Sequence, residues 1–304
     1  MAAVDLRYVL RSMSNVSSSP TLRRCVSLLL GVSAPFWLAM RPAGQVAPPT
    51  VGRPGANAGA LPRTADGKPN LQGIWQVRNR AAYDLQDHAA RFGMPAGKSV
   101  VEGGEIPYQP WAAAKRAENF ASRQTADPLA KCYMPGVPRI MYMEFPFHIF
   151  QTRDHIAMTF EWSQIYRLIY TTGKPALHAG IDSWMGDSRG RWEGDTLVVE
   201  VKGQNDRTWF DMAGNFHSGA LRLVERYTML DADTIQYEVT LEDPKVFTRP
   251  WKISMPLNRQ KNMDRILEYQ CQAEVEEANG LFERDPRTWY PEPGKPAISG
   301  GEIR

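Results

Sequence analysis

Hydrophobic and polar side chains alternate along three segments near the middle of the chain, residues 196–201, 221–227 and 235–241. An alternation with a period of two is typical of a β-strand that buries one face. The polar stretch 230–233 separates the last two segments by the length of a tight turn. These segments therefore predict antiparallel strands that follow one another in sequence order.

The same alternation recurs on both sides of this central part. It predicts further strands at residues 71–77, 147–151, 156–162, 166–170, 251–257 and 266–272, and a turn at 187–190. About nine or ten short strands in neighbouring hairpins favour an antiparallel meander over a parallel sheet. Closing the meander removes its two edge strands. We therefore expect a mainly β protein, an antiparallel meander closed as a barrel, with long loops at its mouth.

One segment has the composition of a helix. Residues 111–123 follow Pro110 and contain several alanines together with Lys115, Arg116 and Glu118. Proline suits the first turn of a helix, because its missing N–H would have no partner there, and alanine has the highest helix propensity. We expect one short helix, which lies against the barrel wall or covers one end.

The first 47 residues have the order of a secretory signal. Arg23 and Arg24 precede an apolar run at 25–40, and small residues follow up to Ala47. This order marks a signal peptide, and a run this short is a poor membrane span. We expect a periplasmic or secreted protein with no stable membrane span after the leader is removed. An uncleaved N-terminal anchor is the alternative.

The rest of the chain divides into three parts by composition. Residues 48–70 are rich in Pro, Gly and Ala and predict a flexible linker, 71–278 predict a single barrel domain, and 279–304 an irregular tail. Two cysteines, Cys132 and Cys271, lie outside the leader. In an exported chain they are expected either to form a disulfide or to remain buried free thiols.

Two resemblances follow from particular residues. Gly73-Ile74-Trp75, at the start of a predicted strand, resembles the Gly-x-Trp signature of lipocalins, in which the indole closes one end of the barrel. The chain from about 69 to 272 is also similar to a family of exported bacterial proteins. The matching residues are Trp184, Gly186, Ser188, the run 191–197, His217-Ser218, Glu225-Arg226 and Asp243-Pro244. The resemblances imply a lipocalin-like (calycin-type) barrel and no particular activity.

Charge and short motifs exclude several classes of function. The net charge is +3, partly from the leader, and no segment carries a stripe of lysine and arginine, so no nucleic-acid partner is expected. Phosphate-binding loops, dinucleotide fingerprints and the histidine spacing of a metal site are absent from the sequence. Ser188 has the formal spacing of a nucleophile elbow but lies in a predicted turn, which is the wrong context. We expect no cofactor and no metal.

Glu225 is the most informative single residue. In the segment 221–227 it shares a face with Leu221, Leu223 and Tyr227, so the alternation turns its carboxylate towards the interior. Burying a carboxylate is costly unless it keeps its proton or finds a partner. Glu225 is therefore expected either to act as a general acid or base, or to form a structural ion pair with an arginine.

The loop at 203–218 supplies other candidate chemistry, because loops at a barrel mouth carry function more often than strands do. It contains Asp211 and His217, which could pair to move a proton, although His217 could equally serve only to hydrogen-bond the loop. Further side chains are expected to contact a ligand as aromatic surfaces or as polar and cationic anchors. They are His148, which is predicted to face the cavity, Arg167, Trp184, Trp209, Phe210, Phe216 and Arg249.

Three hypotheses of function follow from these residues. The first is an exported barrel that binds a small, largely apolar or aromatic molecule in its cavity. The second is an enzyme on the same scaffold, of the hydratase, lyase or isomerase type, with Glu225 and His217 as acid and base. The third is a structural envelope protein without a ligand. Catalysis requires the acid and the base to be aligned in one site, whereas binding does not.

Overall fold

The computed structural model describes residues 60–173, 177, 181 and 183–280. The predicted leader, the first part of the predicted linker and nearly all of the predicted tail lie outside these residues. Within the described part of the chain, no helix is long and apolar enough to cross a membrane.

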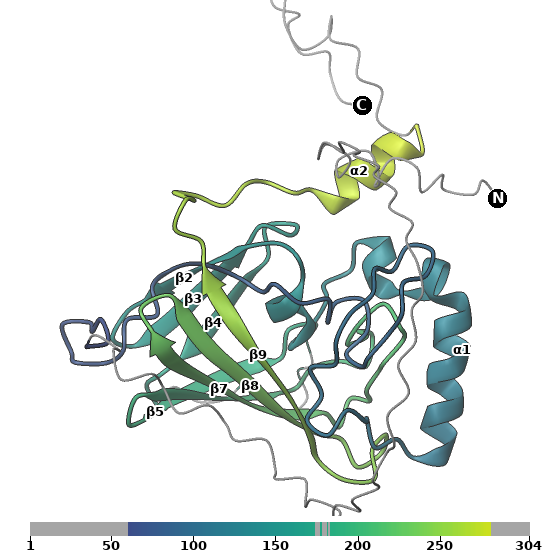
Figure 1. Cartoon of the computed structure of the whole chain (residues 1–304), viewed down its shortest axis with the longest axis horizontal. Helices are drawn as coiled ribbons and strands as arrows, with labels where there is room; N and C mark the ends of the chain where they lie inside the picture. The colour runs from purple at the N-terminus through teal and green to yellow at the C-terminus, as the bar shows by residue number, and fades with distance from the viewer. Residues whose placement is uncertain (1–59, 174–176, 178–180, 182, 281–304) are drawn as a thin grey trace, which may run out of the picture. The chain divides into compact units, whose positions relative to one another are not determined.

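The described residues form a closed barrel of nine strands, in which each strand pairs with its neighbours in sequence and β9 pairs with β1. Figure 1 shows the ring of strands, with β7, β8 and β9 side by side in green. The strands are β1 (Gly73–Gln76), β2 (Phe147–Gln151), β3 (His155–Phe160), β4 (Tyr166–Tyr170), β5 (Asp187–Glu193), β6 (Thr196–Lys202), β7 (Arg222–Asp231), β8 (Thr234–Glu242) and β9 (Trp251–Arg259). The predicted mainly β fold with a closed barrel is confirmed.

The alternation of side chains sets which face of each strand is buried. In β7 and β8 nearly every second residue is buried, and the two strands pair in one register from Arg222 opposite Glu242 to Met229 opposite Ile235, with a shift before Asp231 opposite Thr234. A register shift by one residue would turn every apolar side chain outwards, so the hydrophobic pattern fixes the pairing. The polar turn between them is tight, as predicted.

One pair of strands departs from the predicted meander. β4 and β5 pair in parallel, with Ile169 opposite Ser188, so the two strands run in the same direction. The turn predicted at 187–190 is therefore wrong, because these residues begin β5. Gly190 lies where an added Cβ would be 2.9 Å from the side chain of Ile169, so the small residue permits close packing of strands and does not mark a turn.

The strand predicted at 266–272 is also wrong. After β9 the chain leaves the barrel, and Cys271 begins the short helix α2 (Cys271–Ala278). The pairing of β9 with β1 closes the ring, so no free edge is left for a further strand. The segment touches the barrel only locally, where Tyr269 stacks on Trp162.

Trp75 lies at the end of the barrel where β1 begins, and its side chain is buried. Its indole N–H donates to the carbonyl of Leu71 at 2.9 Å, and the guanidinium of Arg259 lies over the ring, 4.2 Å from its centroid. Gly73 has a φ of +129°, and a Cβ there would overlap the guanidinium of Arg259. Glycine is therefore required two residues before the tryptophan, because it leaves room for the arginine that covers the indole.

Long connections and α1 (Pro110–Ala126) lie at the opposite end of the barrel, where β9 begins (Figure 1). The residue before α1, Gln109, donates its backbone N–H to the carbonyl of Val246, in the turn that precedes β9. On the helix itself, the amide of Asn119 donates to the carbonyl of Gly214. The predicted helix is present and is a few residues longer than predicted.

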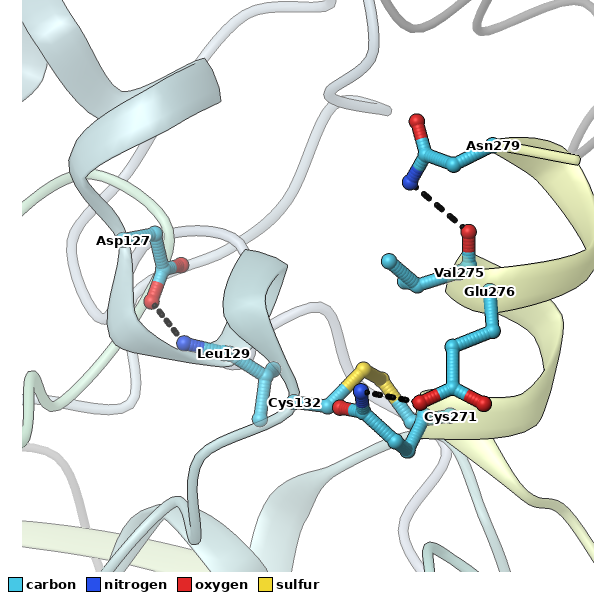
Figure 2. Close-up of a disulfide and its surroundings, with 8 residues drawn as sticks. Asp127, Leu129, Cys132, Cys271, Val275, Glu276 and Asn279 are labelled. Carbon is cyan, nitrogen blue, oxygen red and sulfur yellow. Dashed lines mark hydrogen bonds between the residues drawn. A yellow bond between two sulfur atoms is a disulfide. The ribbon is translucent and has the colours of Figure 1, made fainter. Parts of the chain in front are cut away.

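Cys132 and Cys271 form a disulfide, which decides between the two alternatives that the sequence left open. Cys132 follows the 3-10 turn η2 (Pro128–Lys131), and the bond joins this turn to α2 across 139 residues of sequence. Figure 2 shows the two sulfur atoms between η2 and the first turn of α2. Cys271 is the one buried residue of α2, so the disulfide is the main anchor of this helix.

Candidate functional site

The barrel interior holds a buried polar cluster, which we call the interior cluster. Arg167 of β4 and Glu225 of β7 face each other across the barrel and form an ion pair. Ser188 of β5, Tyr227 of β7 and Tyr237 of β8 complete it. All five side chains are buried. Strand alternation places each of them on the inner face, as predicted for Glu225.

Hydrogen bonds saturate the two charged groups of the interior cluster. Glu225 accepts from both terminal nitrogens of Arg167, from the Tyr227 hydroxyl at 2.9 Å and from the Tyr237 hydroxyl at 2.7 Å. The remaining N–H groups of Arg167 reach the Ser188 hydroxyl at 3.0–3.1 Å and the Tyr227 hydroxyl at 3.2 Å. Burial raises the pKa of both tyrosines, and the Glu225 carboxylate raises it further. Burial opposes the charge of Arg167, yet Glu225 keeps the arginine's pKa above its ordinary value.

Side chains fill the rest of the barrel. Most inward-facing residues are at most 4% exposed, so a water-sized sphere reaches almost none of their surface. They include Phe147, Ile149, Ile156, Met158, Phe160, Ile169, Leu197, Val199, Leu223, Met229, Val239, Met255 and Leu257. Small closed barrels are commonly filled in this way. A ligand that entered the interior would therefore have to displace packed side chains or break the interior cluster.

Asp211 and His217, predicted to pair, belong to two different hydrogen-bond networks. The His217 ring nitrogens face the Thr208 hydroxyl at 2.7 Å and the Ser218 carbonyl at 2.9 Å. Since a carbonyl can only accept, His217 is protonated on Nδ1 and accepts at Nε2. Burial lowers the pKa of His217, which favours the neutral ring. This arrangement matches the alternative that the histidine hydrogen-bonds its own loop.

Asp211 forms a second buried polar group with residues that the sequence did not single out. It accepts hydrogen bonds from the backbone of Leu85 at 2.9 Å and from the backbone and side-chain amides of Asn215 at 3.1 and 2.5 Å. The same Asn215 amide lies 3.4 Å from the Asp84 carboxylate, which Arg116 of α1 contacts at 3.1 Å. Burial, and then the nearby charge of Asp84, raise the pKa of Asp211 to about 7.

Glu225, Asp211 and His217 therefore have separate sets of hydrogen-bond partners. The partners of Glu225 are strand residues inside the barrel, whereas those of Asp211 and His217 belong to the connections at one end. General acid–base catalysis requires both groups within reach of one substrate. Glu225 is hydrogen-bonded to Arg167, which was predicted as a ligand anchor. Among the described residues, the other hydrogen-bond partners of Glu225 are Tyr227 and Tyr237, which were not predicted as site residues.

Most of the predicted ligand contacts serve packing. Phe210 is buried against Phe247 and Trp251, and Phe216 lies between Tyr108 and Trp111. Trp209 pairs with Phe216 through a backbone bridge across the loop. Arg249 is exposed and donates to the carbonyl of Pro250. The rings of Phe210 and Phe216 therefore pack against aromatic side chains within and beside the loop.

His148 faces away from the barrel interior, in contrast to the prediction. β2 turns Phe147 and Ile149 inwards, so the alternation places His148 and Phe150 on the outer face, where their rings stack with centroids 4.0 Å apart. Partial burial lowers the pKa of His148. The prediction placed His148 on the inner face together with Phe150, but β2 turns both rings outwards.

Trp184 is the predicted ligand contact that remains accessible beside other apolar groups. Its ring stacks on Tyr133, with centroids 5.2 Å apart and planes inclined by 21°. Tyr133 and its neighbour Met134 are exposed, as are Leu177 and Ile181 of the crossover that carries Trp184. We call Tyr133, Met134 and Trp184 the aromatic lip. Tyr133 follows Cys132, so the disulfide fixes one side of the lip to α2.

The fold and the site define a closed nine-stranded β-barrel with a charged interior cluster and an exposed aromatic lip. No family model matches the chain, and no curated protein matches it. Among solved structures, the chain is similar to the crystal structure of secretory abundant heat soluble protein 4 from Ramazzottius varieornatus. The match has a TM-score of 0.28 at 12% sequence identity, and it covers 62% of this chain and 94% of that chain.

Proposed function

We propose that the protein is an exported barrel that binds a small, largely apolar molecule, and that the ligand binds at the aromatic lip. The observation that carries the proposal is a group of accessible apolar side chains, in which Tyr133 and Met134 are exposed and Trp184 is half-buried. Contiguous apolar surface is uncommon on a soluble domain unless something binds there. The filled interior supports the same choice, because a site on the lip needs no displacement of buried side chains.

The chemistry of the lip favours a flat, uncharged ligand. Two rings that already stack on each other leave an outer aromatic face on which a further ring can lie. The thioether of Met134 is flexible and polarisable, so it can adapt to ligands of different outline. Contacts of this type bind apolar molecules without requiring a charged anchor, which leaves the ion pair of Arg167 and Glu225 intact.

Export to the periplasm or the exterior is part of the proposal. It is supported by the signal-like order of residues 1–47 and by the disulfide, because disulfides persist mainly in oxidising compartments. Native mass spectrometry of the chain purified from the cell envelope should find a protein that lacks the leader and carries a small apolar molecule. A chain recovered only from the cytoplasm with its leader intact would contradict export.

Binding at the lip can be tested with N-phenyl-1-naphthylamine, a neutral fluorescent probe that avoids attraction by basic residues. We expect Trp184→Ala and Tyr133→Ala each to weaken its binding about tenfold, because each removes one stacking surface of about 1–2 kcal/mol. The measurement is a fluorescence titration of the full chain. Tyr166→Ala is the matched control, since Tyr166 is 75% exposed on the outer face of β4 and belongs to no such group. Equal affinity in all three variants would contradict the proposal.

A further inference from the structure

A small hairpin at residues 88–97 projects an aromatic side chain into solvent. His88 pairs with Gly97, and Arg91 and Met94 exchange two backbone hydrogen bonds of 2.8 and 2.9 Å, so Phe92 and Gly93 form a two-residue turn. Gly93 has a φ of +72°, which glycine adopts without strain. Phe92 is 68% exposed at the tip. A tight turn of this kind leaves its side chain nothing to pack against.

Three guanidinium groups gather beside this hairpin around one aromatic ring. Those of Arg91, Arg116 and Arg123 lie 5.3, 5.4 and 4.2 Å from the centroid of Phe120 on α1. Cation–π attraction offsets part of their mutual repulsion. Among the described residues, only Arg116 of the three is paired with a carboxylate, that of Asp84. Two positive charges therefore remain without a counter-charge next to the exposed tip.

Further basic groups lie near the base of the hairpin. A depression of about 710 Å³ lies between the hairpin and the segment that follows β1, and Arg78, Arg80, His88 and Lys98 are among the residues that line it. Arg80 forms an ion pair with Glu144. Lys98 is almost fully exposed, and its ammonium lies 3.9 Å from the carboxylate of Asp87. Arg78 is exposed and has no ion-pair partner among the described residues. Arg78 thus adds one unpaired positive charge near the base of the hairpin.

We propose that the hairpin at 88–97 docks on the surface of an anionic lipid bilayer. Phe92 would enter the headgroup region, while Arg91, Arg123 and Arg78 would contact lipid phosphates. An exposed aromatic ring beside cationic side chains has the two attractions that interfacial membrane binding combines, apolar burial and charge complementarity. The arrangement does not suit a free phosphate ion, because the unpaired charges come from separate segments, with Arg91 and Arg123 over the Phe120 ring and Arg78 at the depression.

Sedimentation of the full chain with phosphatidylcholine vesicles, with and without phosphatidylglycerol, tests the proposal. We expect binding to the anionic vesicles at about 0.1 M salt and its loss at about 1 M, where the Debye length falls to about 3 Å. Phe92→Ser and Arg91→Glu should each weaken that binding about tenfold or more. The apolar run at 25–40 is common to all variants, so its contribution cancels in the comparison.

Two matched controls and one competitor make the test decisive. Tyr166→Ser removes a similarly exposed ring on β4, and Arg222→Glu reverses an exposed charge on β7. Both should bind anionic vesicles as the unaltered chain does. An equal loss in these controls, or no preference for phosphatidylglycerol, would overturn the proposal. Competition by inorganic phosphate beyond that of sodium chloride at equal ionic strength would also overturn it, in favour of a site for a small anion.

Discussion

Replacing Glu225 by glutamine is expected to lower the free energy of unfolding by about 3–5 kcal/mol, the usual cost of removing one partner of a buried ion pair. Arg167 is 3% exposed and has no other carboxylate among its hydrogen-bond partners, so its charge would remain buried and uncompensated. The Tyr227 and Tyr237 hydroxyls would lose their charged acceptor at the same time. The interior cluster therefore acts as a single unit, and no member can be altered alone without cost.

Urea denaturation followed by tryptophan fluorescence measures this effect. Glu242→Gln is the matched control, because Glu242 lies exposed at the end of β8 and its change should cost no more than about 0.5 kcal/mol. The double variant Arg167→Met, Glu225→Leu should be more stable than Glu225→Gln, since it buries no unpaired charge. If Glu225→Gln were as stable as the unaltered chain, the carboxylate would have to be protonated or solvated, and its assignment to an ion pair would fail.

The second large effect concerns pH and Asp211. Its pKa is about 7 in the folded protein, above the ordinary value of 3.8, because burial and the Asp84 carboxylate disfavour the charged form. Between about pH 4 and pH 7 the folded chain therefore holds a proton that the unfolded chain has lost, so stability decreases as pH rises through this window. The expected decrease from this group is on the order of 3 kcal/mol.

Asp211→Asn should remove this pH dependence, because the amide does not titrate. The amide nitrogen of the new side chain would place a hydrogen-bond donor against the backbone N–H of Asn215, which is also a donor. The variant is therefore expected to be less stable than the unaltered chain at pH 5. At pH 8 the difference in free energy of unfolding between the variant and the unaltered chain should be smaller or have the opposite sign. The measurement is the free energy of unfolding of both chains across this range. His217 is present in both chains, so its own titration cancels in the difference. If the two chains had parallel pH profiles, the assignment of the pH dependence to Asp211 would be refuted.

The two buried networks have different consequences for function. The interior cluster holds β4, β5, β7 and β8 together from inside, whereas the Asp84 and Asp211 network fastens α1 and the loop at 203–218 to the chain before them. The charged groups of the interior cluster all have partners, which suits a structural role. In the Asp84 and Asp211 network, the buried Nε of Arg116 has no hydrogen-bond partner among the described residues. The two proposals rest on exposed surfaces outside both networks, the aromatic lip and the tip of the hairpin at 88–97.

The sequence by itself determined most of the strands and, for β7 and β8, which face is buried. A period of two is a local property, so β7 and β8, the turn between them and the inward direction of Glu225 follow from neighbouring residues alone. The helix was equally readable, because proline and alanine act within one turn. The glycine two residues before Trp75 was read as a motif, but its reason, the room it leaves for Arg259, is a contact between the first and the last strand of the barrel.

Only the tertiary structure decided which distant groups meet. Arg167 is 58 residues from Glu225, Asp84 is more than 120 residues from Asp211, and Cys132 is 139 residues from Cys271. The basic groups near Phe92 come from three separate segments, so no stripe of charge marks them in the sequence. The parallel pairing of β4 and β5 likewise depends on how the ring closes. The period of two decides which face of its own strand a side chain occupies. Closure of the barrel decides which side chains of other strands it contacts.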